Sequence, residues 1–319
     1  MEDKKGSMRR CWAWVRLLRP LQWTKNGVVA IPFFFALGDI YQANKLLNVL
    51  VPKLALVALA IVAFALASSA IYVLNDICDR HQDRLHPEKK FRPIASGDVS
   101  VALALGTLPC LLLASAGAGF FVGIDFLKVL MLYVLLQFAY SFGLKRVMLL
   151  DVFLIAAGFV LRFYAGGKAV SVPVSWWLLL CTFLLALFLG MCKRRQEKGV
   201  MAADSATLPS ASHRAVLEHY SVDALDHYIA MSGTAAIVCY AIYTLSPETV
   251  AKFGTQALAA TVPLVTFGIF RYIHLVHRHK GGGRPERTLV TDIPILLTVV
   301  LYAMTVMAVF FGKLTINNC

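Results

Sequence analysis

The residues of this sequence best suited to chemistry are three aspartates, Asp76, Asp79 and Asp83, spaced i, i+3 and i+7. On a helix these side chains stack on one face, about one turn apart. Like charges so placed repel each other, and Mg²⁺ removes the repulsion because it prefers oxygen ligands and binds carboxylates together with substrate phosphates. The spacing predicts a magnesium site. The alternative is a solvated helix end neutralised by Arg80 and Arg84.

A basic segment follows the aspartates and includes Lys89, Lys90 and Arg92. Basic residues within a turn or two of a carboxylate cluster suit a polyphosphate, because the metal bridges some oxygens while Lys and Arg neutralise others. The segment therefore predicts a phosphate-rich substrate at the aspartates.

Two further charged residues fall inside an apolar stretch, Asp151 at its start and Arg162 three turns deeper. A charge at the centre of a membrane costs at least about 2.5 kcal/mol, so each should face a cavity and have a partner. Asp151 is either a helix N-cap or a residue that orients Lys145. Arg162 either binds a phosphate or pairs with a buried acid.

The elements that must position these residues are membrane helices. Of the 319 residues 59% are hydrophobic and 15% charged, with a mean hydropathy of +0.69. Soluble proteins average about 25% charged residues. Helices are expected, because backbone polar groups in lipid must be satisfied within their own segment and the runs do not alternate as barrel strands do. The apolar runs of sufficient length are nine: 24–41, 51–74, 100–122, 125–143, 149–169, 175–191, 225–246, 252–275 and 289–311.

The fold class predicted is thus all-α, a polytopic integral membrane protein with a single domain over 1–319 and a basic N-terminal segment, 1–23. Of the 31 Lys and Arg residues, 24 lie in the N-terminal segment and the even-numbered loops. Positive loops face the cytoplasm, which places these loops and the aspartates on the cytoplasmic side of the plasma or inner membrane. This bias explains the net charge of +13, so nucleic-acid binding is not expected. None of the seven cysteines forms a CxxC pair, and no zinc or redox motif is expected.

The sequence NDICDRHQD (75–83), followed by HPEKKFRPIASG (86–97), resembles the first aspartate-rich motif of the UbiA-type intramembrane prenyltransferase superfamily. The resemblance extends over nearly the whole chain, including the nine apolar runs. It implies a helix bundle around a central cavity that opens sideways to lipid, with Mg²⁺ as the cofactor.

Typical prenyl-transferring members carry a second acidic motif after the sixth helix, but here 192–198 reads CKRRQEK, with Glu197 as its single acid. This basic run should touch an anion directly. The segments that resemble the decaprenyl-phosphate phosphoribosyltransferase branch are LRPLQWTKN (18–26), LK (144–145), LDV (150–152), KRRQE (193–197) and GGRPE (282–286). That branch implies transfer of phosphoribose from 5-phosphoribosyl diphosphate to a polyprenyl phosphate, with release of pyrophosphate.

This interpretation assigns catalysis and metal binding to Asp76, Asp79 and Asp83. Asp151 would then hold the ribose hydroxyls or orient Lys145. The expected substrate-binding residues are Asn75, Lys25, Asn26, Lys89, Arg92, Lys145, Asp151, Arg162, Lys193 and Arg194. The rivals are an aromatic prenyltransferase of the same superfamily, which the missing second acidic motif disfavours, and a transporter, which the grouping of charges at one face disfavours. Isoprenoid length and oligomeric state, including a homo-oligomer, are left open.

Overall fold

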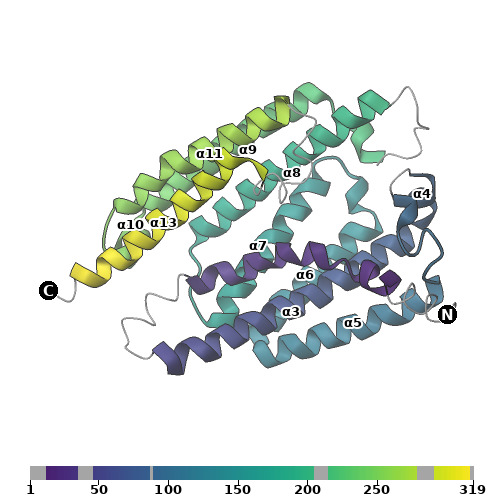
Figure 1. Ribbon diagram of the computed structural model, residues 1–319, viewed down its shortest axis with the longest axis horizontal. Coiled ribbons are helices and arrows are strands. Elements are labelled where there is room, and N and C mark those ends of the chain that lie inside the picture. The colour runs from purple at the N-terminus through teal and green to yellow at the C-terminus, as the bar shows by residue number, and fades with distance from the viewer. Residues whose placement is uncertain (1–11, 35–45, 87–88, 205–214, 279–290, 317–319) are drawn as a thin grey trace.

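The computed structural model in Figure 1 is an all-helical bundle. The structure describes residues 12–34, 46–86, 89–204, 215–278 and 291–316. Within those ranges every regular element is helical, seven helices are long and apolar enough to cross a membrane, and Ile293–Val309 is a shorter apolar helix. The predicted fold class is confirmed, whereas the predicted count of nine spans is not.

The α-helices are α3 (Leu46–Cys78), α4 (Arg80–Leu85), α5 (Val101–Val122), α6 (Ile124–Phe142), α7 (Leu150–Val170), α8 (Trp176–Asp204), α9 (Val222–Leu245), α10 (Pro247–Phe253), α11 (Val262–Arg278) and α13 (Ile293–Ile316). The 3-10 helices are η1 (Pro20–Ala30), η2 (Lys89–Phe91), η3 (Leu144–Arg146), η5 (Ala215–His219) and η6 (Ala257–Thr261).

Three predicted spans differ from the helices observed. The span predicted at 24–41 begins in η1, and residues 35–41 lie outside the described residues. The one predicted at 252–275 starts later, because α10 ends at Phe253. Gly254, with a φ of +69°, caps that helix before η6 and α11 begin. The one predicted at 175–191 continues as α8 to Asp204. Lys, Arg, Gln and Glu are good helix formers, so the KRRQE run extends the helix instead of forming a loop.

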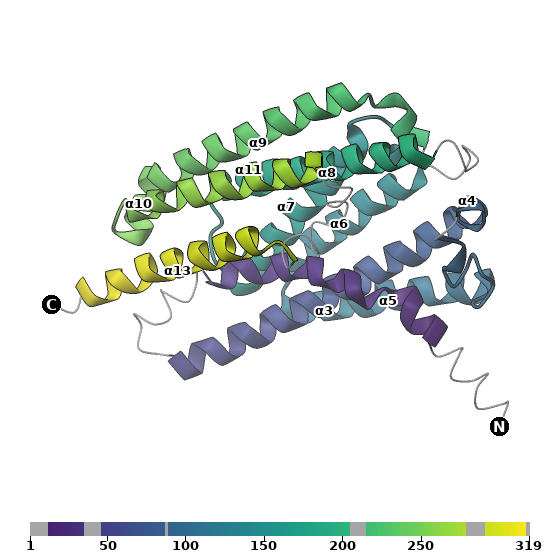
Figure 2. The ribbon, with the colours of Figure 1, turned by 45° about the horizontal axis from the view of Figure 1, so that its top comes forward.

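The two sides of the bundle meet at α7. Figures 1 and 2 place α9 and α11 on one side and α3 and α5 on the other, with α7 between them. One hydrophobic core joins α7, α8, α9 and α11 around Phe188 and Ile229, and another joins α3, α6 and α7 around Phe64 and Leu130. Large apolar side chains such as Leu135 remain exposed, as expected for a surface in contact with lipid.

The segment η1 lies directly against α7. A Cβ atom at Gly166 would stand 2.1 Å from the carbonyl oxygen of Val29, so only glycine allows this approach. The contact brings the N-terminal part of the chain to the middle of α7, where Asn26 meets Arg162.

Candidate active site

The three motif aspartates lie where α3 passes into α4. Backbone hydrogen bonds from Asp79 N to Asn75 O (2.8 Å) and from Asp83 N to Asp79 O (2.9 Å) carry the helical course across this junction. The carboxylates therefore follow one another by about one turn, as their spacing predicts. Asp76 and Asp83 are buried and Asp79 is half-buried.

Two arginines neutralise the buried pair of carboxylates. Nη1 of Arg92 donates to Oδ1 of Asp76 at 3.2 Å and to Oδ2 of Asp83 at 2.7 Å. Arg19 also binds Asp76 Oδ1, and its guanidinium lies 5.1 Å from the centre of the Tyr72 ring. Arg92 is thus placed at the predicted site. Arg19 was not predicted there, although it belongs to the segment at 18–26 that carries part of the family resemblance.

A third cation reaches the remaining aspartate from η3. Nζ of Lys145 donates to both oxygens of Asp79, at 2.7 and 2.9 Å, and to Asn75 Oδ1 at 3.5 Å. The site therefore draws cations from the residue before η1, from the segment after α4 and from η3, which are brought together at the end of α3. The predicted proximity of Asn75, Lys145 and the aspartates is present in the structure.

The carboxylates do not form a single cluster of metal ligands. Among the described residues, no group of three or more His, Cys, Asp or Glu is arranged to hold a metal ion. The expectation that all three converge differs from the structure, because Asp76 and Asp83 turn toward Arg92 while Asp79 turns toward Lys145. One observation still fits a hard cation: Oδ2 of Asp76 is buried and has no hydrogen-bond partner within the described part of the chain.

Three predicted lysines occupy different elements. Lys25 lies on η1, Lys89 begins η2, and Lys193 lies on α8, and each of them is partly buried. The backbone N–H of Lys89 donates to Nδ1 of His86 at 3.3 Å, which fixes the start of η2. Their part in substrate binding stays a prediction.

Arg194 is buried and paired with acids of its own chain, an environment that disfavours the predicted role in substrate binding. Its side chain is 1% exposed, and it pairs with Asp151 at 2.7 Å and with Glu197 at 2.6 Å. Two acids already neutralise it, and it has little contact with solvent. Asp151 is likewise no N-cap, because Leu149 precedes the helix and Asp151 lies within the first turn of α7. Its carboxylate binds Arg194 and not Lys145.

Tyr220 completes this buried network and was not found from the sequence. Its hydroxyl donates to Asp151 Oδ1 at 2.8 Å and accepts from the Leu149 N–H at 2.7 Å. Burial raises the pKa of Tyr220, so the hydroxyl keeps the proton that it donates. Leu149 has a φ of +67°, which is costly for a side chain with a Cβ. Tyr220 therefore holds the strained turn that follows Lys145.

Arg162 lies in a second buried polar cluster, where its partners are neutral. Its Nε donates to Asn26 Oδ1 at 3.0 Å and its Nη2 to the hydroxyl of Tyr133 at 2.6 Å. Ser68 Oγ lies 3.4 Å from both acceptors. The guanidinium also lies 5.3 Å from the Phe159 ring centre. Arg162 thus has partners, as predicted, but none of those in the described part of the chain is a buried acid.

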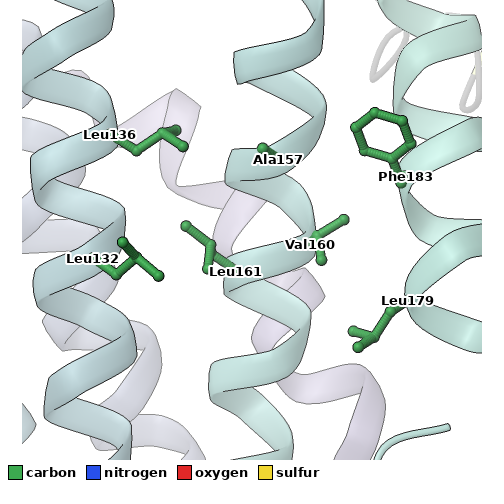
Figure 3. A pocket seen from close by; sticks show the side chains of 7 residues that line it. All are labelled: Leu132, Leu136, Ala157, Val160, Leu161, Leu179 and Phe183. Carbon is green, nitrogen blue, oxygen red and sulfur yellow. The ribbon is translucent and has the colours of Figure 1, made fainter. Parts of the chain in front are cut away.

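An apolar pocket of about 310 Å³ lies on the other side of α7. Figure 3 shows its lining side chains, which come from α6, α7 and α8 and are Leu132, Leu136, Ala157, Val160, Leu161, Leu179 and Phe183. A lining of this kind suits a hydrocarbon chain and offers nothing to a charged group.

Comparison with known proteins gives matches along almost the whole chain. The pattern of the UbiA prenyltransferase family matches residues 31–291. The decaprenyl-phosphate phosphoribosyltransferase of Corynebacterium glutamicum is 33% identical over 301 residues, which cover 93% of this chain and 86% of that protein. The protein of the same name from Mycolicibacterium smegmatis is 31% identical over 305 residues, covering 93% and 92%.

A solved structure shares the fold. The UbiA homolog from Archaeoglobus fulgidus bound to GPP and Mg²⁺ superposes with a TM-score of 0.66 and covers 95% of this chain and 99% of its own. Its sequence identity is 18%, so this likeness concerns the arrangement of helices and not the substrate.

Proposed function

Because this chain belongs to the UbiA prenyltransferase family and is an integral membrane transferase, we propose a specific reaction for it. The protein transfers 5-phosphoribose from 5-phosphoribosyl diphosphate to a polyprenyl phosphate and releases pyrophosphate. The observation that carries this proposal is the match over 93% of the chain to proteins named decaprenyl-phosphate phosphoribosyltransferase.

The end of α3 supports a diphosphate site. Lys145 and Arg92 lie within hydrogen-bond distance of the aspartates, so a diphosphate bound against the motif has both cations beside it. Charge-assisted hydrogen bonds from Arg and Lys are the strong contacts to phosphate oxygens. Arg92 and Lys145 occupy the carboxylates in the structure, so Asp76, Asp79 and Asp83 would hold Mg²⁺ only once these two cations turn to the diphosphate. Bound there, Mg²⁺ would neutralise the negative charge on the departing pyrophosphate.

The acceptor brings its own nucleophile. A phosphate monoester loses its second proton with a pKa of about 6, so a phosphate oxygen of the lipid is ionised at neutral pH and needs no general base. That oxygen forms a bond to C1 of the ribose as the bond from C1 to the diphosphate oxygen breaks. Direct displacement inverts C1. The residues of the chain contribute by positioning the two anions and by stabilising the leaving group.

The polar end of α8 also favours this reaction over its rival. Transfer of an isoprenyl chain to an aromatic acceptor would resemble relatives that hold further Mg²⁺ on a second acidic motif. Here the one acid of the 192–198 run, Glu197, is paired with the buried Arg194. It is therefore a poor ligand for a second metal ion.

We further propose that the aspartate motif faces the cytoplasm, since most basic residues lie at this end of the sequence-predicted spans. A cysteine at exposed Ser96, in a chain whose native cysteines are replaced by serine, should react with a membrane-impermeant maleimide after cells are opened and not before. Labelling in intact cells would show that the aspartate motif faces the outside instead.

One assay tests the reaction. Purified protein is given labelled 5-phosphoribosyl diphosphate and Mg²⁺, with either a series of polyprenyl phosphates or an aromatic acid and an allylic diphosphate. Label should enter the polyprenyl phosphate and disappear when the divalent metal is chelated. Prenylation of the aromatic acid, with no transfer of phosphoribose, would establish the rival reaction.

Asp79→Ala provides a sharper arm of that assay. It removes a motif carboxylate and should abolish turnover while the protein still elutes as a folded monodisperse species. Asp125→Ala is the matched control, because Asp125 is exposed at the start of α6 and its one ion pair among the described residues is with its neighbour Lys128. Normal turnover by Asp79→Ala would remove the motif from the mechanism.

A further inference from the structure

We propose that Arg162 and Asn26 form a phosphate-binding position inside the helix bundle, deeper in the membrane than the aspartate motif. It binds the phosphomonoester group of one substrate. The identity of the two candidate substrates rests on the proposed function, because both the donor and the lipid acceptor of that reaction carry such a group.

The charge of Arg162 has no acidic partner among the described residues. Arg162 is 7% exposed and lies in the middle of a membrane-spanning helix. Within the described residues its hydrogen-bond partners, Asn26 and Tyr133, are neutral, and no Asp or Glu forms an ion pair with it. A buried cation without a counter-ion is costly, and ionisable residues at membrane depth mark ligand paths. An anion bound here would supply the missing charge.

The cluster also contains hydrogen-bond donors that have no acceptor among the described residues. The Asn26 side chain is fully buried, and its Nδ2 has no hydrogen-bond partner among the described residues. Its oxygen accepts from Arg162 Nε, so the amide N–H₂ group is the part of the side chain that remains available to a ligand. Nη1 of Arg162 also makes no hydrogen bond in the described part of the chain. An amide and a guanidinium that both retain N–H donors match the oxygens of a phosphate.

The cluster lies well away from the aspartate motif along α3. Ser68, which touches the cluster, lies eight residues before Asp76 on α3, or about 12 Å along the helix axis. A diphosphate held at the aspartates therefore leaves this cluster to a different anionic group. Two groups have the required chemistry: the 5-phosphate of the donor and the phosphate headgroup of the lipid acceptor.

Two substitutions test the position. Arg162→Gln removes the charge at nearly constant shape. Asn26→Asp leaves the shape unchanged but gives Arg162 an internal counter-ion, so the cluster no longer needs an external anion. The control is Lys168→Gln, which removes a positive charge from an exposed position of the same helix. Gel filtration confirms that each variant is folded, and Asn26→Asp keeps the test valid if Arg162→Gln does not fold.

The probes are ribose 5-phosphate and farnesyl phosphate, titrated separately into the protein in nanodiscs by calorimetry. Each carries one phosphomonoester and no diphosphate. Both variants should bind one of them about ten- to a hundredfold more weakly than wild type, the usual value of a charge-assisted hydrogen bond, while Lys168→Gln binds as wild type does. Loss confined to ribose 5-phosphate assigns the position to the donor, and loss confined to farnesyl phosphate assigns it to the acceptor.

Unchanged affinity in both variants, or no binding of either probe to wild type, overturns the proposal. Failure of the proposed function is a separate result, seen as an absence of phosphoribosyl transfer by wild-type protein. The two titrations need no turnover and decide this site in either case.

Discussion

Arg194 and Arg162 are both buried arginines of membrane-spanning helices, but they differ in whether acidic side chains surround them. Arg194 is held between Asp151 and Glu197, with carboxylate oxygens at 2.7 and 2.6 Å. Arg162 binds an amide oxygen and a phenol hydroxyl and lies against two aromatic rings. Burial alone therefore does not separate a cation paired with acids from one whose partners among the described residues are neutral.

Whether an acidic side chain neutralises a buried arginine determines whether that arginine is suited to bind an anion. A buried cation with two acids is complete within the folded chain, and removing it leaves the acids uncompensated. A buried cation with neutral partners carries an uncompensated charge, which an anionic substrate can neutralise. Four substitutions test this comparison, and they are given from the largest expected effect to the smallest.

The largest effect is expected for Arg194→Met. The change leaves Asp151 buried and without its cation, which should lower the free energy of unfolding by about 3–5 kcal/mol. Thermal unfolding in detergent measures the loss. Replacing Asp151 by Leu in the same chain should restore most of it, because no buried charge then lacks a partner. A loss below about 1 kcal/mol for the single variant, the level of a surface pair, would contradict the structural role.

A smaller effect is expected for Tyr220→Phe, which keeps the ring and removes the hydroxyl. Asp151 loses a donor and the Leu149 N–H loses its acceptor, so the free energy of unfolding should fall by about 1–3 kcal/mol. Because the strained turn follows Lys145, the turnover number should fall as well, with little change in the KM of the lipid acceptor. Tyr228→Phe, on α9, is a control outside the network. Equal effects on both tyrosines would place Tyr220 outside the site.

Arg162→Met should change stability far less than Arg194→Met. The loss of an uncompensated buried charge should raise the free energy of unfolding. The loss of the donor to Asn26 Oδ1 and the Tyr133 hydroxyl should lower it, so the two effects oppose each other. A net change within about 1 kcal/mol is expected in the same unfolding experiment without substrates. A loss as large as that of Arg194→Met would erase the distinction between the two arginines.

The smallest effect concerns the ion pair between Arg271 on α11 and Asp292, the residue before α13. The hydrogen bond from Arg271 holds the pKa of Asp292 below its ordinary value. A depressed folded pKa stabilises the protein above the unfolded pKa of about 3.9, and that contribution is lost as the pH falls further. Asp292→Asn should therefore unfold at a slightly lower temperature than wild type at pH 7, with the difference shrinking as the pH falls below about 3.9. A difference that grows on acidification would contradict the pairing.

The arrangement of the three aspartates at the end of α3 follows from their spacing in the sequence. The i, i+3, i+7 aspartates are placed on successive helical turns because α3 and α4 keep the helical backbone pattern across their junction. Arg92 was expected near them from its position in the chain, and Lys145 was expected at the substrate site in a segment that resembles the family. The structure places both beside the aspartates. Arg19 and Tyr220 were missed, because each lies dozens of residues from its partner and no local pattern marks the contact.

The sequence by itself determined that this chain is a helical membrane protein with a polar end built on three aspartates, because hydropathy and helical periodicity are local properties. It also located the buried charges. Only the tertiary structure decided what those charges do. Arg194 and Arg162 look alike in sequence, yet Asp151, 43 residues from Arg194, and Asn26, 136 residues from Arg162, set their roles. The partner of a buried charge is chosen by how helices pack, and packing joins residues that local sequence keeps apart.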